Sequence, residues 1–181
     1  DKEIESALVG KPAEILLKLN SLEDRALIRK LYDASNAGVK VRLIIRGICC
    51  LVPGVEGLSA NIEAISIVDR YLEHTRVYSF HNNGRPLVML SSADWMGRNL
   101  DRRIEVAFPI TDPALQRQVL ELMEIQWNDH VKARVLDPLQ TNPYRTPRPK
   151  DRSSRAQERT HDQLQRSARK SSKTKKVIRK R

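Results

Sequence analysis

The first third of the chain alternates between strand-like and helix-like patterns, and this alternation limits the possible folds more than any other feature. Residues 14–20 favour a short strand, and residues 41–46 form a second β-rich run. Between them, Ser21 and Asp24 open a helix that we expect to end near Asn36, because its apolar positions recur with the period of a helix face. A strand, a helix and a strand with short connections make a βαβ unit, so we predict an α/β domain with a partly parallel sheet.

The patterns that follow extend this unit into a mixed sheet flanked by helices. An Asn-Gly pair at residues 83–84 lies between two β-rich runs, which is a strong hairpin signal. Pro113 begins a second amphipathic helix that we expect to reach about His130. The Gly- and Pro-rich stretch 51–59 is a loop that either wraps a ligand or simply connects two elements. The remaining expected strands are residues 65–68, 77–80, 87–90, 103–109 and 131–136.

The basic character of the chain is confined to its C-terminal segment. Residues 141–181 hold 15 of the 33 Lys and Arg residues but only 3 of the 22 Asp and Glu residues. We therefore predict a folded domain over residues 1–139 and a largely disordered basic tail over residues 140–181, with a weak solvated helix around 154–170. The tail has three candidate uses: holding a polyanionic product, binding nucleic acid without sequence preference, or keeping the protein soluble. Any nucleic-acid binding is expected only there.

Several other classes of protein are disfavoured by the sequence. No stretch approaches the length of a membrane span. Cys49 and Cys50 are adjacent, so a disulfide between them would be strained, and we expect a cytoplasmic protein, either free or at the periphery of a membrane. The four histidines are too scattered for a metal site. The chain begins at Asp1 without a methionine, in a helix-compatible stretch, which fits a piece of a longer protein.

The best candidate for chemistry is His74, which is followed two residues later by Arg76 and, after the hairpin, by the polar segment 91–94. An imidazole can act as a nucleophile or as a general acid and base near neutral pH. A guanidinium binds phosphate oxygens as a bidentate fork. The combination is typical of phosphoryl transfer, although a lone histidine at the start of a strand is more often a solvated residue than a catalyst.

Further arginines lie close to the apolar strands of the body, where an anionic ligand would explain them. Arg46 follows a strand at the sheet edge where ligands of α/β domains collect. Arg103 is a candidate phosphate ligand, whereas Arg102 is equally well explained by a cross-strand ion pair with Glu105.

Two acidic residues, Glu73 and Asp94, either orient His74 or pair with neighbouring arginines, and pairing is favoured for Glu73. Arg98 completes this set of cations.

The residues around His74 resemble the half-motif of the phospholipase D superfamily, which runs His-x-Lys, then an acid, then Gly-Ser-x-Asn. Here Arg76 replaces the lysine, Asp94 replaces the asparagine, and the position of the acid holds His81. A longer series of segments resembles, in order and in spacing, the C-terminal catalytic half of the histidine-dependent bacterial polyphosphate kinases. These segments are residues 18–22, 31–35, 43–49, 53–54, 72–76, 91–96 and 98–105.

This resemblance implies a phospholipase D-like fold and a role in reversible transfer of the terminal phosphate of ATP to polyphosphate through a phosphohistidine. By position, Arg46 and His74 resemble the contacts of the family with nucleotide phosphate, ATP or ADP, and Arg103 resembles a further phosphate-binding arginine. The resemblance places the phosphorylated histidine and the Mg²⁺-binding groups in an N-terminal half that this chain lacks. The chain alone should then be inactive, with that half as its partner in a homo-oligomeric enzyme.

Two other functions stay open on the sequence. The first is a homodimeric phosphodiesterase of the phospholipase D superfamily, in which each chain supplies one histidine; the absence of a lysine after His74 argues against it. The second is a non-enzymatic polyanion-binding module whose basic tail does the binding.

Overall fold

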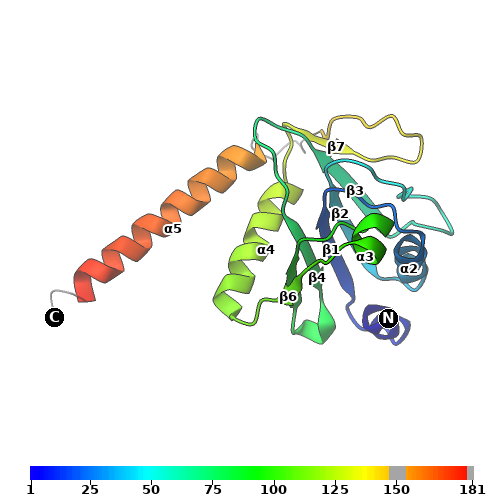
Figure 1. Ribbon diagram of the computed structural model, residues 1–181, viewed down its shortest axis with the longest axis horizontal. Helices are drawn as coiled ribbons and strands as arrows, with labels where there is room; N and C mark the ends of the chain where they lie inside the picture. The colour runs from blue at the N-terminus through cyan, green and yellow to red at the C-terminus, as the bar shows by residue number, and fades with distance from the viewer. Residues whose placement is uncertain (147–153, 179–181) are drawn as a thin grey trace.

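One mixed sheet of seven strands forms the centre of the protein (Figure 1). The computed structural model describes residues 1–146 and 154–178. Strands β1, β2 and β3 are parallel, and β4, β5, β6 and β7 complete the sheet with antiparallel pairings in the order β6-β5-β4-β1-β2-β3-β7. Their bounds are β1 Glu14–Leu19, β2 Lys40–Ile45, β3 Ile62–Ile67, β4 Arg76–Phe80, β5 Leu87–Ser91, β6 Ala107–Pro109 and β7 Ala133–Val135.

Helices cover both faces of this sheet (Figure 1). On one face, α2 packs its buried side chains Ile28, Leu31 and Ala34 into the main core cluster. On the other face, Met123 of α4 packs against Leu16 of β1. The helices are α1 Lys2–Leu8, α2 Arg25–Asn36, α3 Gly97–Arg102, α4 Pro113–Trp127 and α5 Ala156–Ile178, and a 3-10 turn covers Asn82–Gly84.

The central position of β1 explains its sequence. Leu17 faces the core on the α2 side, while the neighbouring Leu16 faces α4, so both faces of the strand are buried. A strand that is covered on both faces reads as a continuous apolar run rather than as an alternation. Removing both faces from water is the main driving force for this arrangement, at about 25 cal/mol per Å² of apolar surface.

Most of the expected elements are confirmed. The βαβ unit is present with parallel strands β1 and β2, and α2 is capped by Asp24, whose side chain accepts a hydrogen bond from the amide of Leu27 at 2.8 Å. The predicted hairpin turns at Asn83 and Gly84, both of which have positive φ angles. The amphipathic helix that starts at Pro113 is also confirmed, and it ends at Trp127.

The predicted strand over residues 103–109 is only half right. β6 begins at Ala107, which pairs with Ser91, the last residue of β5. Residues 103–105 extend past the end of that partner strand, so they have no edge with which to pair, and the side chain of Ile104 is fully exposed. The short helix α3, which precedes this segment, was not predicted.

The C-terminal segment contains a longer helix than the weak one expected around 154–170. α5 extends away from the sheet beyond α4 (Figure 1). Its first residue, Ala156, is buried. The expected disorder of residues 147–153 and 179–181 falls outside the described residues, and the division at residue 139 stays a prediction. None of the helices in the described ranges is long and apolar enough to cross a membrane.

Candidate functional site

One edge of the sheet gathers the candidate residues. β1 and β2 run parallel and end at this edge, β4 begins there because it is antiparallel to β1, and β5 ends there because it is antiparallel to β4. Arg46 therefore follows β2 at the same edge where His74 precedes β4 and Asp94 follows β5. The topology thus brings Arg46, His74 and Asp94 to one end of the sheet.

Arg76, the first residue of β4, forms an ion pair with Asp94. Its Nη2 lies 2.7 Å from Oδ2 of Asp94, and its Nε donates to Oδ1 at 3.2 Å. Asp94 is only 2% exposed, and its Oδ1 also accepts the amides of Asn20 and Ser21 at 2.7 and 3.1 Å. Burial raises the pKa of Asp94, but the Arg76 guanidinium and the two amides outweigh it and hold that pKa below its usual range.

His74 is exposed and contacts the same guanidinium. Its Nδ1 and Nε2 lie 3.1 and 2.9 Å from the two terminal nitrogens of Arg76, whose Nη1 also donates to the His74 carbonyl at 3.0 Å. A neutral imidazole has one acceptor nitrogen, so the tautomer decides which of the two receives a hydrogen bond. Asp94 thus orients Arg76, and Arg76 in turn contacts the imidazole, whereas Asp94 itself is bonded to the arginine rather than to His74.

Arg46 is half-buried just after β2 and is joined to the same network through Asn20. Its Nε donates to Oδ1 of Asn20 at 2.7 Å, and the amide of Asn20 is one of the two that donate to Asp94. A continuous chain of contacts therefore runs from Arg46 through Asn20 and Asp94 to Arg76 and His74. Asn20 did not stand out in the sequence, although its place directly after a buried strand is typical of a site residue.

Arg103 is exposed and, within the described ranges, makes no ion pair or hydrogen bond through its side chain. Glu105 nearby does not pair with Arg102 as one reading of the sequence had it. It accepts hydrogen bonds from Ser92 and from the Nδ2 of Asn99. The Ser92 and Asn99 bonds lower the pKa of Glu105, and the charges of Arg103 and Arg76 lower it further.

A buried lysine lies under the site and was missed by the sequence analysis. Lys18 is 3% exposed within the apolar run of β1, and its Nζ lies 3.4 Å from Oε2 of Glu73, the residue before His74. Burial lowers the pKa of Lys18, with a smaller lowering from the charge of Arg46, while Glu73 opposes both. Glu73 therefore pairs as favoured, but its partner is a lysine. The signal available in the sequence was a single charge inside an otherwise apolar strand.

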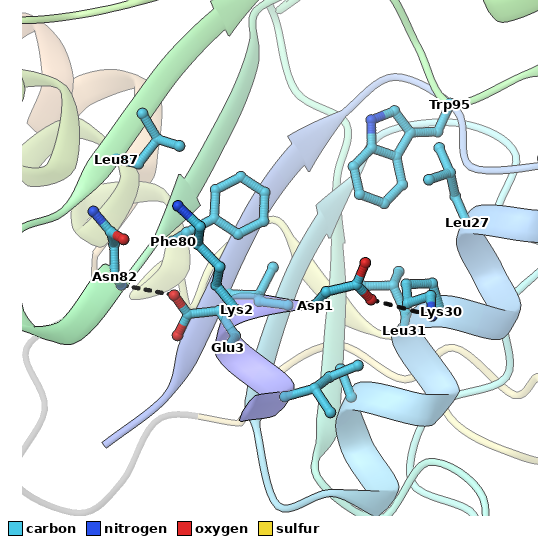
Figure 2. A pocket seen from close by; sticks show the side chains of 13 residues that line it. Asp1, Lys2, Glu3, Leu27, Lys30, Leu31, Phe80, Asn82, Leu87 and Trp95 are labelled. Carbon is cyan, nitrogen blue, oxygen red and sulfur yellow. Dashed lines mark hydrogen bonds and ion pairs between the residues drawn. The ribbon is translucent and has the colours of Figure 1, made fainter. Parts of the chain in front are cut away.

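A sizeable cavity lies away from these residues. It has a volume of about 580 Å³ and lies between α1, α2 and the sheet face formed by Phe80 and Leu87 (Figure 2). Trp95 lines one part of it, and its polar contacts, such as the hydrogen bond from the amide of Asn82 to Glu3, are already paired. The cavity contains none of the four candidate site residues. Its lining is mainly apolar, and one of its two lysines, Lys30, is already paired with Asp1 at 3.2 Å.

Possible metal ligands are sparse. The described residues include no group of three or more His, Cys, Asp or Glu side chains placed to hold a metal ion. Both cysteines are free thiols.

Comparison with known proteins gives consistent matches. A family model described as polyphosphate kinase C-terminal domain 2 matches residues 1–157. A polyphosphate kinase of Vibrio cholerae is 58% identical over 144 residues, which are 80% of this chain and 20% of that protein. The crystal structure of polyphosphate kinase from Porphyromonas gingivalis superimposes with a TM-score of 0.88 at 45% identity, and the match covers 92% of this chain and 25% of that one.

A more distant structure defines the fold. Nuc from Salmonella typhimurium, a phospholipase D family member, matches with a TM-score of 0.54 at 19% identity, and the match covers 74% of this chain and 88% of that one. The mixed sheet flanked by helices is therefore a phospholipase D-like fold. The chain spans between a fifth and a quarter of the polyphosphate kinases that it matches.

Proposed function

This chain belongs to the polyphosphate kinase family, and we propose that it supplies the anion-binding half of a phosphotransferase site in which His74 moves a proton. The proposed reaction is the reversible transfer of the terminal phosphate of ATP to polyphosphate. ATP or ADP and polyphosphate are the substrates. The rest of a polyphosphate kinase is the partner that completes the site.

The observation that carries the proposal is the chain of contacts from Arg46 to His74. Two cations and an imidazole lie at one edge of the sheet, and the charge of Arg103 acts on Glu105 together with that of Arg76 to lower the pKa of this carboxyl. Arg46 and Arg103 have no carboxylate partner in the described ranges, so their charge is available to a ligand. Arg76 shares its charge with Asp94, and we assign it chiefly the orientation of His74.

The chemistry of the reaction suits these residues. Phosphoryl transfer between two anions needs an in-line nucleophile and positive charge around the equatorial oxygens, and most of the barrier is lowered by that charge. Arg46 and Arg103 would bind the phosphate oxygens. His74 would give a proton to the departing phosphate oxygen or accept it in the reverse direction, because an imidazole exchanges protons near neutral pH.

The nucleophile in this proposal belongs to the rest of the enzyme. A histidine nitrogen there attacks the γ-phosphorus of ATP, a phosphorus–nitrogen bond forms, and the bond to the ADP oxygen breaks. The chain alone is then inactive, because the nucleophile and its acid partner act as one unit. Mg²⁺ would accompany the nucleotide and neutralise phosphate charge, but the donor groups described here do not form a site for it, so no step passes through the ion.

The test is reconstitution of activity. The chain is mixed with a polypeptide that carries the remaining length of a polyphosphate kinase, and ATP-dependent polyphosphate formation is measured. His74→Ala should lower kcat by about 100-fold or more, which is the usual contribution of a general acid or base. His81→Ala is the matched control, because His81 lies at the opposite end of β4 and its side chain makes one hydrogen bond within the described residues, from the amide of Gly84 at 3.3 Å.

Activity that survives His74→Ala at the level of His81→Ala would remove His74 from the mechanism.

The predicted assembly state of the complete enzyme, a homo-oligomer, is tested by light scattering on the same sample. Its predicted location, in the cytoplasm or at the periphery of a membrane, is tested by cell fractionation.

A further inference from the structure

His74 lies at the end of a loop that has little structure of its own. The His74 loop, residues 68–75, joins β3 to β4 and contains no helix or strand. Three of its large apolar side chains, Val68, Tyr71 and Leu72, are about two-thirds or more exposed, so packing contributes little to its order. Something else must fix the loop if His74 is to meet a phosphate in one geometry.

The start of α5 supplies that fixation from a distant part of the sequence. Arg155 binds Asp69 at the beginning of the loop with two hydrogen bonds, Nε to Oδ2 at 2.9 Å and Nη2 to Oδ1 at 2.6 Å. The Asp69 side chain is 1% exposed, so this bidentate pair is largely shielded from water. The Arg155 bond lowers the pKa of Asp69 despite its burial.

Gln157 holds the middle of the same loop through its backbone. Its Oε1 accepts the amide of Tyr71 at 3.0 Å, and its Nε2 donates to the carbonyl of Tyr71 at 2.8 Å. The same Nε2 donates to Oε1 of Glu73 at 3.1 Å, and Glu73 is the partner of the buried Lys18. A single side chain thus satisfies both polar groups of one loop residue and the carboxylate next to His74.

The segment that carries these two side chains is itself anchored to the domain. The amide of Ala156 donates to Oδ2 of the buried Asp129 at 2.6 Å, and the carbonyl of Ser154 accepts the amide of His130 at 2.9 Å. Residues 154–157, here called the latch, therefore connect the end of α4 to the His74 loop. The latch is hydrogen-bonded to Asp129 and His130 of the domain, and it contacts the loop at Asp69, Tyr71 and Glu73.

From this geometry we infer that Arg155 and Gln157 are positioning residues that hold the His74 loop in the conformation that binds condensed phosphate. The inference rests on the proposed function for the role of His74, but the fixation of the loop by the latch is independent of it. A side chain that the fold already holds in place reacts faster, because its orientational entropy is lost on folding and not each time a ligand binds.

The experiment uses nuclear magnetic resonance on the 181-residue chain with Gln157→Leu, Arg155→Ala and two controls. Gln165→Leu and Arg166→Ala repeat the same substitutions further along α5, where the Gln165 side chain is hydrogen-bonded to His161 of the same helix and, within the described residues, to no loop residue. Three quantities are measured: exchange of the Tyr71 amide, nuclear Overhauser contacts between the His74 ring and the Arg76 side chain, and the dissociation constant for tripolyphosphate. Gln157→Leu is the decisive variant because it changes no charge.

In Gln157→Leu, exchange of the Tyr71 amide should accelerate by about 10-fold or more, since its acceptor is lost. Arg155→Ala keeps that acceptor but frees Asp69, so it should accelerate the same exchange by a smaller factor. The contacts between His74 and Arg76 should weaken and tripolyphosphate should bind several-fold more weakly, while the β1 amides and both controls stay at wild-type values. Unchanged exchange in Gln157→Leu, or faster exchange with His74 contacts intact, would overturn the inference. If the wild-type chain does not bind tripolyphosphate, the proposed function fails, and the first two measurements still decide the role of the latch.

Discussion

The Nη2 atom of Arg76 lies 2.7 Å from the Asp94 carboxylate, and this pair is the structural centre of the candidate site. Both side chains are nearly removed from water, at 11% and 2% exposure. Asp94 also fixes the chain after β1 through two amides, so the pair joins β1, β4 and the end of β5. The cation beside His74 is therefore held by the fold, and it is less available to a ligand than its position in the sequence suggests.

We predict that Arg76→Met destabilises the domain strongly. The substitution leaves the buried Asp94 carboxylate without its cation, and breaking such a pair costs about 3 kcal/mol of unfolding free energy. The double variant Arg76→Met with Asp94→Asn should lose less than the sum of the two single variants, because it leaves no uncompensated charge. Urea unfolding of the three variants measures this coupling. Additive losses would show that the two side chains do not interact.

The stability of the chain should fall with acid in a manner that depends on Asp94. Its pKa is lowered in the folded state, so below about pH 5 the unfolded chain binds more protons than the folded one. The contribution of the carboxylate is therefore fully present above the ordinary pKa of aspartate and is lost as the pH falls through the folded pKa. Unfolding free energies at pH 7, 5, 4 and 3 should decline less steeply in Asp94→Asn than in wild type. Equal slopes would contradict the shift.

Gly47 should be sensitive to an added side chain, although its backbone is not strained. A Cβ at this position would lie 3.1 Å from the carbonyl oxygen of Asn20, the residue that holds Arg46, and 3.6 Å from Oγ of Ser21. Gly47→Ala should therefore cost about 1 kcal/mol of unfolding free energy through overpacking, and it should weaken phosphate binding by displacing Arg46.

Gly97→Ala is the matched control for this position. Gly97 is the first residue of α3, and a Cβ added there would lie 3.4 Å from the flexible side chain of Asp101. Alanine there should leave stability unchanged or raise it by up to about 1 kcal/mol. If Gly97→Ala lowered the free energy of unfolding as much as Gly47→Ala does, the close approach to Asn20 would not explain the loss at Gly47.

Much of the fold could be predicted because it is encoded locally. The apolar run of β1, the capped helix that begins after Asp24 and the turn at Asn83 each depend on neighbouring residues. The rule that ligands collect where parallel strands end also singled out Arg46 without knowledge of any contact. The prediction of a strand was wrong for residues 103–106 because their conformation is not encoded locally. Whether these residues form a strand depends on where the partner strand β5 ends.

The contacts that define the site could not be predicted in the same way. The bond between Arg76 and Asp94 depends on the register between β4 and β5, in which Arg76 pairs with Ser91. The contacts of Arg155 and Gln157 join residues that are 86 positions apart, and their segment has too few apolar residues to indicate packing. The sequence indicated only a solvated helix there, because ion pairs and side-chain-to-backbone bonds leave no periodic pattern.

The last prediction concerns Arg46 and Arg103, the two proposed phosphate ligands, which have no carboxylate partner among the described residues. Arg46→Ala and Arg103→Ala should each weaken binding of tripolyphosphate by the chain, by about 10-fold for Arg46, because a charge-assisted bond to phosphate contributes about 1.5–3 kcal/mol. Arg46→Lys should recover only part of the affinity, since lysine keeps the charge but not the planar fork. Arg85→Ala removes the same charge from the hairpin at the opposite end of the sheet, and it should leave binding unchanged. Isothermal titration calorimetry at two salt concentrations measures all four variants. An equal loss in Arg85→Ala would mean that the chain attracts polyanions by its net charge alone, and Arg46 and Arg103 would then have no special place in the site.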